Sequence, residues 1–444
     1  MSAFKAYERY KPSGVKWLGD VPEHWKVSKI GYEYAIQLGK MLQPEPKLQT
    51  DVLKPYLRSA NIAWEGVKLD DIKEMWFNQS EILKYKLLKD DVVLSEGGDV
   101  GRASYWNNDN EMYIQNAIIR LRSNLYNSNS TKFIYYFLSL IKKSGWIDIL
   151  CNSNTIAHYT AEKVTATVFL KPTFEEQTII AQYLDQKTAQ IDALIAKKQQ
   201  LLNKLAEQRT ALISHAVTKG LNPDAPLKKS GVEWLGDVPE HWEVKRLKFL
   251  VSEPLKYGAN ESAELTDTDL PRYIRITDVK DDGSLWDDTF RSLMPEVAEE
   301  YLLSEGDILL ARSGATVGKN FIYRKSWGIA AYAGYLIRAR MDVQIMNADF
   351  TYLFLQSHNY WSWLRSVIIQ ATIQNVSAEK YNNVFLPVPS LHEQDEIIST
   401  VNTKTAELDQ MVAKVKTVIQ KLKEYRAALI TQAVTGKIDI RSLV

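Results

Sequence analysis

The chain has 444 residues, of which 45% are hydrophobic and 25% charged, and its formal net charge is +1. This length predicts two to four domains with cores of their own, and the composition is that of an ordinary globular protein. A total charge near zero excludes a uniformly basic nucleic-acid-binding surface, so any DNA-binding charge must be gathered on particular faces.

The single cysteine, Cys151, excludes a disulfide framework within the chain and favours a reducing compartment. The first residues lack the apolar core of a signal peptide, and no apolar run is long enough to cross a bilayer. We therefore expect a cytoplasmic protein without a membrane segment.

A stretch of thirteen residues occurs twice along the chain. Residues 13–25 and 230–242 differ only at Lys16 and Glu233, and the two copies are 217 residues apart. At the same offset, residues 172–218 align without a gap on residues 389–435, with 20 of 47 positions identical. A repeat of this length predicts two copies of one structural unit.

The repeated stretch itself predicts a turn, because its Gly-Asp and Val-Pro pairs disfavour a regular helix. Trp17 and Trp25 are expected to anchor this turn to a core. His24 and His241 have no Cys, His or carboxylate partner at metal-ligand spacing, so we interpret them as surface or capping histidines.

Residues 27–125 predict a mixed region of short strands. The apolar run 91–94 is followed by a glycine-rich loop that ends at Arg102, and the run 307–310 is followed by a similar loop that ends at Lys319. A nucleotide-binding P-loop needs four residues between its glycines and Ser or Thr after the Lys, whereas this loop has three residues and Asn320. Contact with a DNA phosphate fits both copies better than nucleotide binding.

Helical spacing of apolar residues follows in each half. Residues 131–150 and about 347–369 have apolar side chains at steps of three and four, which predicts helices. Extended polar stretches come next, at 152–159 and 369–376. Each half therefore begins with a mixed α/β domain.

A long helix is predicted after each domain. Thr173 with Glu176, and Ser390 with Glu393, form capping boxes at corresponding positions. Helical periodicity then continues to about Val217 and Val434, with Gly220 and Gly436 as stops.

The two helices carry matching heptad seams, because alternating steps of four and three meet mostly apolar residues. The apolar seam positions are Ile180, Leu184, Ile191, Leu194, Leu201, Leu205 and Leu212, then Ile397, Val401, Leu408, Met411, Val415, Val418, Leu422 and Leu429. Lys187 and Lys404 occupy equivalent seam positions, where they either set the register or extend to solvent. Two such rods of about 65 Å most simply pack on each other, antiparallel if a pseudo-twofold axis relates the halves.

Motifs for catalysis are missing from the sequence. There is no Asn-Pro-Pro-Tyr-like methyltransferase motif, no nuclease-like set of metal carboxylates, and no Cys/His pair or serine elbow for nucleophilic catalysis. The sequence indicates a binding protein without a catalytic or metal site.

The duplicated motifs together resemble the specificity subunit of Type I restriction–modification systems. The resemblance covers essentially the whole chain and depends on a duplicated Gly-x-x-Trp-Leu-Gly-x-x-Pro-x-x-Trp stretch and a Pro-x-x-x-Glu-Gln opening of each helix. The matching residues are Gly14, Trp17, Leu18, Gly19, Pro22 and Trp25, Gly231, Trp234, Leu235, Gly236, Pro239 and Trp242, and the helix openings Pro172, Glu176, Gln177, Pro389, Glu393 and Gln394.

This resemblance implies an α+β protein in which two pseudo-repeated mixed α/β target-recognition domains are joined by two long helices that form an antiparallel coiled coil. The expected bounds are 1–171 for the first target-recognition domain, 172–220 for the central spacer helix, 221–388 for the second domain and 389–444 for the C-terminal spacer helix and tail. Each domain would read one half of a bipartite double-stranded DNA target, while the helices set the gap and dock two methylation subunits. S-adenosylmethionine, ATP and Mg²⁺ would be bound by those and by restriction subunits, and none by this chain.

Residues that contact DNA bases cannot be transferred from the family, because its recognition surfaces have no fixed motif. Polar loops at equivalent places in the two halves supply the candidates instead. They are Arg58, Ser59, Asn61, Ser95, Gly98, Arg102, Asn154, Thr155 and His158, then Arg275, Thr277, Arg312, Ser313, Lys319, Thr372, Gln374 and Asn375. Arg favours guanine, and Asn or Gln favours adenine.

Two other functions are compatible with parts of the sequence. A stand-alone coiled-coil protein that bridges DNA without a methyltransferase partner would bind DNA tightly by itself. A nuclease would cleave DNA with Mg²⁺, although the missing motifs argue against it.

Overall fold

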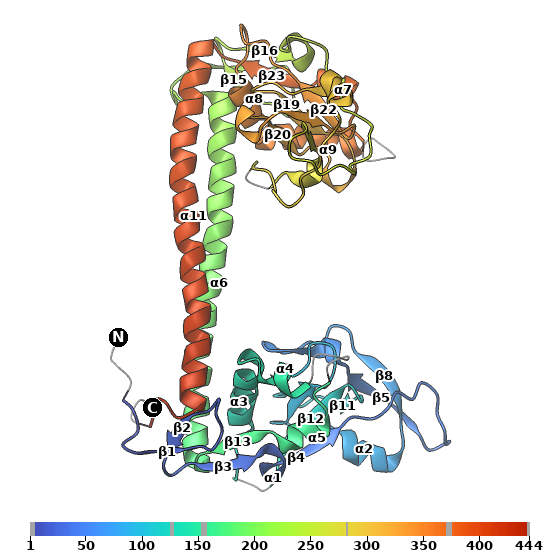
Figure 1. The fold of residues 1–444 in the computed structure, drawn as a ribbon, viewed down its shortest axis with the longest axis vertical. Helices are drawn as coiled ribbons and strands as arrows, with labels where there is room; N and C mark the ends of the chain where they lie inside the picture. The colour runs from blue at the N-terminus through green and yellow to red at the C-terminus, as the bar shows by residue number, and fades with distance from the viewer. Residues whose placement is uncertain (1–4, 125–127, 152–157, 281–282, 370–374, 442–444) are drawn as a thin grey trace. The chain divides into compact units, whose positions relative to one another are not determined.

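The computed structural model describes residues 5–124, 128–151, 158–280, 283–369 and 375–441, and the chain divides into two compact units (Figure 1). Unit 1 comprises residues 1–198 and 417–444, and unit 2 comprises residues 199–416. The chain passes between the units twice, and both passages lie inside a long helix, α6 (Phe174–Lys219) or α11 (Leu391–Val434). Both helices have the predicted extent.

Unit 1 is built on small sheets and short helices. Its four-stranded sheet has the order β10-β9-β12-β4, and a three-stranded sheet has the order β11-β5-β8, with β5 and β11 parallel. Strand pairs β1-β2, β3-β13 and β6-β7 complete the unit. The strands are β1 (Tyr10–Pro12), β2 (Asp20–Pro22), β3 (Lys26–Lys29), β4 (Tyr34–Leu38), β5 (Val52–Leu57), β6 (Ile62–Ala63), β7 (Gly66–Val67), β8 (Lys73–Phe77), β9 (Val92–Ser95), β10 (Ala103–Tyr105), β11 (Tyr113–Ile114), β12 (Ile118–Ser123) and β13 (Val168–Lys171). The helices before α6 are α1 (Ile30–Glu33), α2 (Gln79–Tyr85), α3 (Thr131–Lys143), α4 (Trp146–Cys151) and α5 (Ala161–Ala166).

Unit 2 repeats this arrangement. Its four-stranded sheet has the order β17-β22-β19-β20, and the parallel pair β18-β21 corresponds to β5-β11. Pairs β14-β15 and β16-β23 correspond to β1-β2 and β3-β13. The strands are β14 (Leu227–Lys229), β15 (Asp237–Pro239), β16 (Glu243–Arg246), β17 (Lys256–Tyr257), β18 (Arg272–Ile274), β19 (Ile308–Ala311), β20 (Asn320–Ile322), β21 (Ala330–Tyr332), β22 (Leu336–Ala339) and β23 (Phe385–Val388). The helices are α7 (Pro295–Ala298), α8 (Ala348–Phe354), α9 (His358–Ile369) and α10 (Ala378–Asn382). The sequence repeat is therefore a repeat of structure.

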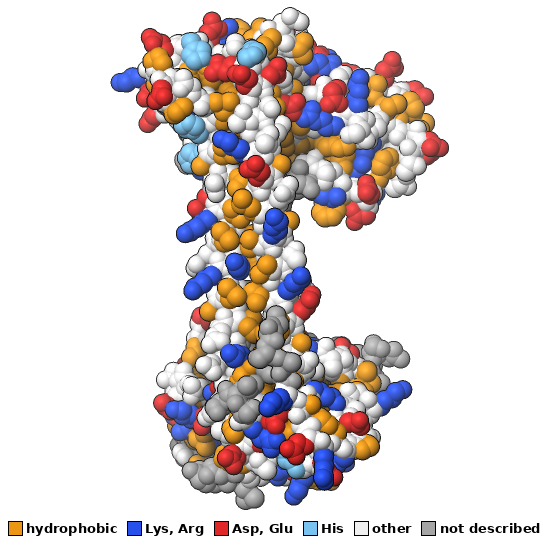
Figure 2. All heavy atoms as spheres, turned by 90° about the vertical axis from the view of Figure 1, so that its left-hand side faces the viewer, with side chains coloured by type: hydrophobic (Ala, Val, Ile, Leu, Met, Phe, Trp, Pro, Cys, Tyr) orange, Lys and Arg blue, Asp and Glu red, His pale blue; other side chains and the backbone are white. Residues whose placement is uncertain are grey.

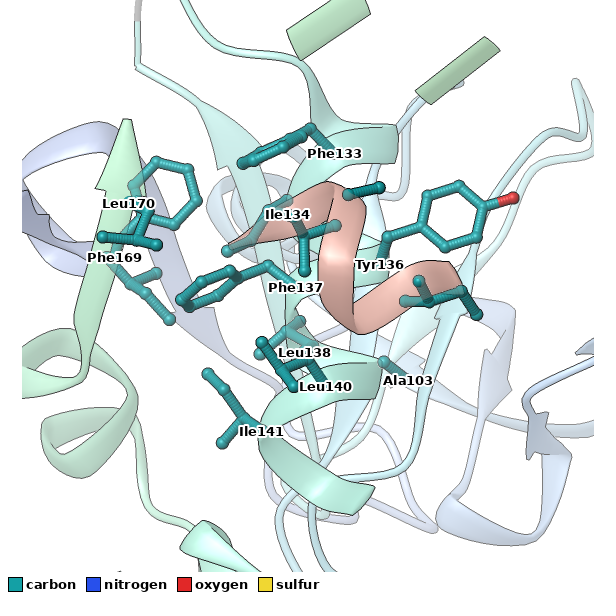
Figure 3. Close-up of a cluster of buried hydrophobic side chains, with 14 of the residues drawn as sticks. Ala103, Phe133, Ile134, Tyr136, Phe137, Leu138, Leu140, Ile141, Phe169 and Leu170 are labelled. Atoms are coloured by element: carbon teal, nitrogen blue, oxygen red, sulfur yellow. The ribbon is translucent and has the colours of Figure 1, made fainter. Parts of the chain in front are cut away.

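The predicted helix over 131–150 is two helices, α3 and α4. The chain turns between them at Gly145, whose φ of +73° favours glycine. Phe133 and Phe137 of α3 point towards β13, where both lie against Phe169 (Figure 3). This apolar cluster also includes residues of α6 and α11, so the helix ends belong to the core of the unit.

The thirteen-residue repeat packs on the end of a long helix in each unit. Trp25 is fully buried against Phe133 and the position of Gly436 at the end of α11. Trp242 is fully buried at the end of α6, where Gly220 lies. Gly220 and Gly436 have φ of +75° and +68°, which confirms both as helix stops.

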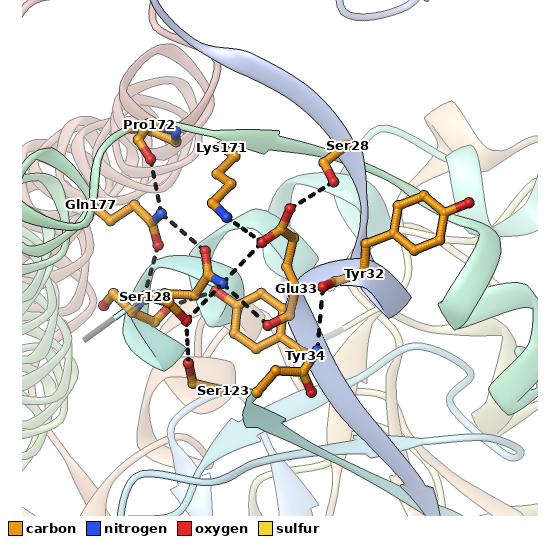
Figure 4. A network of polar contacts seen from close by, with 12 residues as sticks. Ser28, Tyr32, Glu33, Tyr34, Ser123, Ser128, Lys171, Pro172 and Gln177 are labelled. Atoms are coloured by element: carbon orange, nitrogen blue, oxygen red, sulfur yellow. Dashed lines mark hydrogen bonds and ion pairs between the residues drawn. The ribbon is translucent and has the colours of Figure 1, made fainter. Parts of the chain in front are cut away.

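The Glu-Gln pair at the start of each long helix fastens that helix to its unit. Gln177 donates to the backbone oxygen of Pro172 at 3.1 Å and accepts from the backbone nitrogen of Ser130 at 2.8 Å (Figure 4). Gln394 repeats both contacts, with Pro389 at 3.0 Å and Asn347 at 2.7 Å. Both side chains are fully buried, so the amide is satisfied only in this orientation of helix and domain.

The neighbouring glutamates bind the repeated histidines. Thr173 caps the backbone nitrogen of Glu176 at 3.2 Å, and the Glu176 carboxylate contacts His24 Nε2 at 2.9 Å. In unit 2 the Glu393 carboxylate contacts His241 Nε2 at 3.0 Å. The histidines therefore hold the repeated stretch on the helix start, which gives them a structural role.

The long helices pair antiparallel within each unit. In unit 1, Tyr7 contacts Glu176 near the start of α6 and Arg441 just after α11, while Asp192 pairs with Arg426 at 2.9 Å. In unit 2, Gly220 at the end of α6 lies near Glu393 at the start of α11. Arg209 pairs with Asp409 further along that unit's helices. The predicted antiparallel pairing is confirmed in both units.

The buried seam differs from the predicted one in one of its two rows. The row containing Leu184, Ile191 and Leu205 on α6, and its counterpart containing Val401, Leu408 and Leu429 on α11, is buried as expected. Beyond Ile180 and Ile397, which are buried as predicted, the other row lies one residue further along each helix. Thr188, Ile195, Leu202 and Arg209 replace Lys187, Leu194, Leu201 and Gln208 on α6, and Thr405, Val412, Ile419 and Arg426 replace Lys404, Met411, Val418 and Tyr425 on α11.

The displaced row leaves apolar side chains exposed along both helices. Leu194, Leu201, Met411, Val418 and Tyr425 have between 38% and 50% of their surface exposed. Figure 2 shows apolar side chains at the surface of the paired helices. We call these five residues the exposed row.

Neighbouring leucines on α6 provide a direct test of the seam. Leu202→Ala removes a side chain from the seam and should lower the free energy of unfolding by about 2 kcal/mol. Leu201→Ala, on the exposed row, should change it by less than about 0.5 kcal/mol. Chemical denaturation of the purified chain measures both, and equal effects would mean that Leu201 is also part of the seam.

Candidate nucleic-acid interface

One β-turn in unit 1 joins the loops that carry most of the predicted DNA-binding residues. The turn runs from Gln115 to Ile118, between β11 and β12, with a backbone hydrogen bond of 2.8 Å. Its Ala117 oxygen accepts from the backbone nitrogen of Glu96 at 3.0 Å and from Ser59 Oγ at 3.1 Å. Asn116 donates to the backbone oxygen of Lys40 at 2.8 Å. Three loops therefore meet on this turn, and we call residues 39–42, 58–59, 96–102, 115–118 and 158 the first recognition cluster.

The equivalent turn in unit 2 runs from Ala333 to Leu336, between β21 and β22. The Tyr335 oxygen accepts from the backbone nitrogen of Arg312 at 3.1 Å, and Gly334 donates to the Ala259 oxygen at 2.6 Å. The backbone nitrogen of Ala333 donates to Ile274, the residue before Arg275, at 3.0 Å. Residues 257–260, 275–277, 312–319, 333–336 and 375 form the second recognition cluster.

Most described candidates of the first half lie in the first cluster. Arg58 forms an ion pair of 2.6 Å with Asp71, and its guanidinium holds the pKa of that carboxyl below its ordinary value. Arg102 donates to the backbone oxygen of Ser59 at 3.0 Å. Gly98 and His158 are exposed, and His158 lies against Gly97. Asn154 and Thr155 lie outside the described residues.

Two candidates of the first half are buried. The Asn61 side chain accepts from the backbone nitrogen of Arg58 at 2.8 Å and donates to the backbone oxygens of Lys68 and Asp71. Ser95 is fully buried at the end of β9, and within the described part of the chain its hydroxyl has no hydrogen-bond partner. Neither side chain reaches the surface, so both shape the cluster from beneath and we leave them out of the proposed contacts.

The described candidates of the second half surround the second turn. The Arg312 guanidinium lies 4.7 Å from the ring centroid of Tyr257, and its Nε is 3.5 Å from the side-chain oxygen of Asn375. Ser313 pairs with Asn375 in an isolated bridge. Arg275 is bound to Asp278 at 2.6 Å. Thr277 is exposed in the 3₁₀ turn Ile276–Asp278, and Lys319 is exposed at the end of its loop. Thr372 and Gln374 lie outside the described residues.

The two clusters share a backbone frame and differ in side chains. Glu96 and Arg312 occupy equivalent positions, because the backbone nitrogen of each donates to its turn. The backbone oxygen of each accepts from the last residue of the polar stretch, Tyr159 at 3.0 Å for Glu96 and Val376 at 2.8 Å for Arg312. Gly101 and Gly318 also correspond, since Gly101 faces Ile147 of α4 and Gly318 faces Leu364 of α9. An acidic residue in one unit thus stands where the other has a basic residue.

The sequence did not single out four of these residues: Glu96, Met41, Tyr257 and Tyr335. Glu96 lies directly after a buried strand, as Arg312 does, and that shared position was a signal for it. Burial raises the pKa of the Glu96 carboxyl. Met41 and Tyr335 have 75% and 68% of their surface exposed, which only the fold reveals.

Three other features of the described residues concern a metal site, a phosphate-binding helix start and a membrane span. Within the described ranges, no group of three or more His, Cys, Asp or Glu side chains could hold a metal ion. Residues 314–316 form one turn of 3₁₀ helix in the glycine-rich loop of unit 2. Over the same described ranges, no helix is both long and apolar enough to cross a membrane.

Comparison with known families agrees with the repeat. The family described as Type I restriction modification DNA specificity domain matches residues 22–204 and again residues 239–421. These two matches are separated by the same offset as the sequence repeat.

Curated relatives resemble the chain over most of its length. It is 24% identical over 367 residues to the EcoBI specificity subunit of a type I restriction enzyme from Escherichia coli, which covers 80% of this chain and 75% of the relative. It is 23% identical over 439 residues to the MjaVIII specificity subunit from Methanocaldococcus jannaschii, which covers 95% of both.

Solved structures share the fold. A chain from work on complex assembly and conformational transition of the type I R-M system matches with a TM-score of 0.70 and 13% identity, over 93% of this chain and 98% of that chain. The HsdS subunit from Thermoanaerobacter tengcongensis matches with a TM-score of 0.53 and 16% identity, over 94% and 98%. Because the family match spans both copies of the repeat, the chain belongs to the DNA specificity family of type I restriction–modification systems.

Proposed function

We propose that this chain gives a type I restriction–modification complex its DNA sequence specificity by reading a bipartite target, one half with each recognition cluster. Members of this family are DNA-recognition subunits, so methyl transfer and cleavage belong to other chains. S-adenosylmethionine, ATP and Mg²⁺ would be bound by two methylation subunits and by restriction subunits. Such a complex would act in the cytoplasm, where it meets DNA.

The observation that carries the proposal is the repeated backbone frame with different side chains. Each cluster joins loops from three parts of its unit on one turn, yet Glu96 in the first corresponds to Arg312 in the second. Carboxylates accept from cytosine N4, whereas arginine donates to guanine. Two readers with unlike groups at one position predict two unlike half-sites and a non-palindromic target.

The paired helices would set the gap between the half-sites. The chain passes between the units only inside α6 and α11, so helix length fixes how far apart two rigidly mounted readers can bind. A stiff connection lets two weak contacts act at high effective concentration when the DNA spacing matches.

The exposed row is the surface that we assign to the methylation subunits. Five apolar side chains at heptad spacing on two helices lie outside the buried seam. Apolar surface of this kind marks protein contacts. We therefore expect the methylation subunits to cover this row.

A genome-wide map of methylated adenine tests the proposal. Cells would express this chain together with the methylation subunit encoded beside it, and the control would lack only this chain. We expect a bipartite motif, methylated on both strands, that appears only when this chain is present.

Two results would contradict the proposal. A single contiguous motif would mean that one unit alone reads DNA. No new methylation, with both proteins folded and associated, would favour the stand-alone DNA-bridging protein, which should bind DNA tightly without partners.

A further inference from the structure

Tyr335 projects from the centre of the second recognition cluster. It occupies the third position of the turn Ala333–Leu336, and 68% of its surface is exposed. The two residues before it, Ala333 and Gly334, are small. The aromatic ring is therefore the one bulky group that this turn presents to solvent.

The backbone beneath Tyr335 is fixed on three sides. Gly334 donates to the Ala259 oxygen at 2.6 Å, and the Tyr335 oxygen accepts from Arg312 at 3.1 Å. A Cβ at Gly258 would lie 2.2 Å from the oxygen of Tyr332, so the neighbouring loop is packed directly against the turn. A side chain on so restrained a backbone is held ready for contact.

Two arginines belong to the same recognition cluster as Tyr335. Arg312 is hydrogen-bonded to the turn through its backbone and lies over Tyr257, while Arg275 follows the residue that binds Ala333. Guanidinium groups bind phosphates and the guanine edge. An exposed aromatic ring in the same cluster needs an apolar partner in DNA, and in the major groove the base edges offer one such group, the 5-methyl of thymine.

The first cluster carries its apolar group on a different loop. Ala117 corresponds to Tyr335, and it leaves the turn without a bulky side chain. The adjoining loop supplies Met41, which is 75% exposed and follows Lys40, the residue bound by the turn. Its counterpart in unit 2 is the polar Asn260. Each cluster thus has an exposed apolar side chain, and its position differs between the two.

We propose that Tyr335 is a specificity-determining residue that contacts the 5-methyl group of one thymine in the second half-site. Met41 is its counterpart for the first half-site. This inference rests on the proposed function, because it needs the second recognition cluster to face DNA.

The test compares thymine with uracil, which lacks only the 5-methyl group. Binding of the complex with its methylation subunits would be measured on duplexes in which each thymine of the second half-site is replaced in turn. We expect one replacement to weaken binding about four-fold, the value for removing one buried methyl-sized group. In Tyr335→Ala, thymine and uracil should bind equally at that position.

Two variants serve as controls. Tyr335→Phe keeps the apolar ring and should keep the discrimination, so its loss would assign the reading to the hydroxyl and overturn the proposal. Met41→Ala should leave discrimination in the second half-site unchanged.

The remaining outcomes distinguish a failure of this inference from a failure of the proposed function. Sequence-specific binding without any effect of uracil in the second half-site, or an effect that persists in Tyr335→Ala, overturns this inference alone. Failure of the complex to bind any bipartite sequence overturns the proposed function and this inference with it.

Discussion

Lengthening both long helices by one heptad should move the half-sites apart without changing them. Duplicating residues 199–205 of α6 and residues 413–419 of α11 adds seven residues to each helix and preserves the heptad spacing of the seam. The added length is about 10 Å, or roughly three base pairs. We expect methylation at the original targets to be lost and the same half-sites to be methylated with a longer gap.

The control for this prediction carries the duplication in α6 alone. Its helices differ in length, so the seam of α6 no longer matches that of α11 and no methylation at either spacing is expected. Methylation mapping in cells reads both variants. A folded double variant that still methylates only the original spacing would show that the helices do not set the gap.

Replacing Gly258 by alanine should impair recognition of the second half-site and leave recognition of the first unchanged. An added Cβ would lie 2.2 Å from the Tyr332 oxygen and 2.5 Å from the Ala333 oxygen. Both neighbours are backbone atoms, one in the residue before the recognition turn and one in its first residue, so the turn must move. Overpacking of this kind costs about 1–3 kcal/mol. The methylated motif of Gly258→Ala should therefore be relaxed or lost in its second half only.

Gly39→Ala is the matched control, because its Cβ would lie 2.3 Å from the oxygen of Gln115 in the first turn. The reciprocal result is expected: a disturbed first half-site and an intact second one. Thermal unfolding of each purified complex separates local displacement from global loss of structure. Variants that both fold and both keep the wild-type motif would show that these turns do not read DNA.

Some features of the fold could be read directly from residue patterns. Proline, glycine and tryptophan in residues 13–25 predicted an anchored turn, and Trp25 is fully buried. Gly220 and Gly436 predicted helix ends, since only glycine adopts a positive φ freely. Helix 131–150 was harder, because helical spacing continues across Gly145, where the chain turns.

The seam of the long helices shows what the spacing of apolar residues cannot predict. Leu201 and Leu202 are both apolar, and they lie four and three residues before the buried Leu205. Steps of four and three alone cannot choose between the rows. The partner helix and the attached domain decide which one is covered, and they cover the row of Leu202.

The residues of the recognition clusters were still harder to predict from the sequence. Arg58, Arg102 and Arg312 were predicted from loops at equivalent places, and the structure puts each beside a turn. Ser95 and Asn61 came from the same reasoning and are buried, because strand ends and capping positions look like polar loops in a sequence. Tyr335 gave no signal, since an aromatic residue before a strand normally indicates core.

By itself, the sequence determined the repeat, the two long helices and their ends, because these depend on local propensity and on spacing along one chain. The tertiary structure alone decided which helix row is buried, which polar residues are covered, and which three loops meet on each turn. Those features depend on contacts between segments far apart in the sequence, such as Lys40 with Asn116 and Arg312 with Tyr335. Backbone hydrogen bonds make these contacts, and because the backbone is the same for every residue type, such contacts leave no pattern in the side chains.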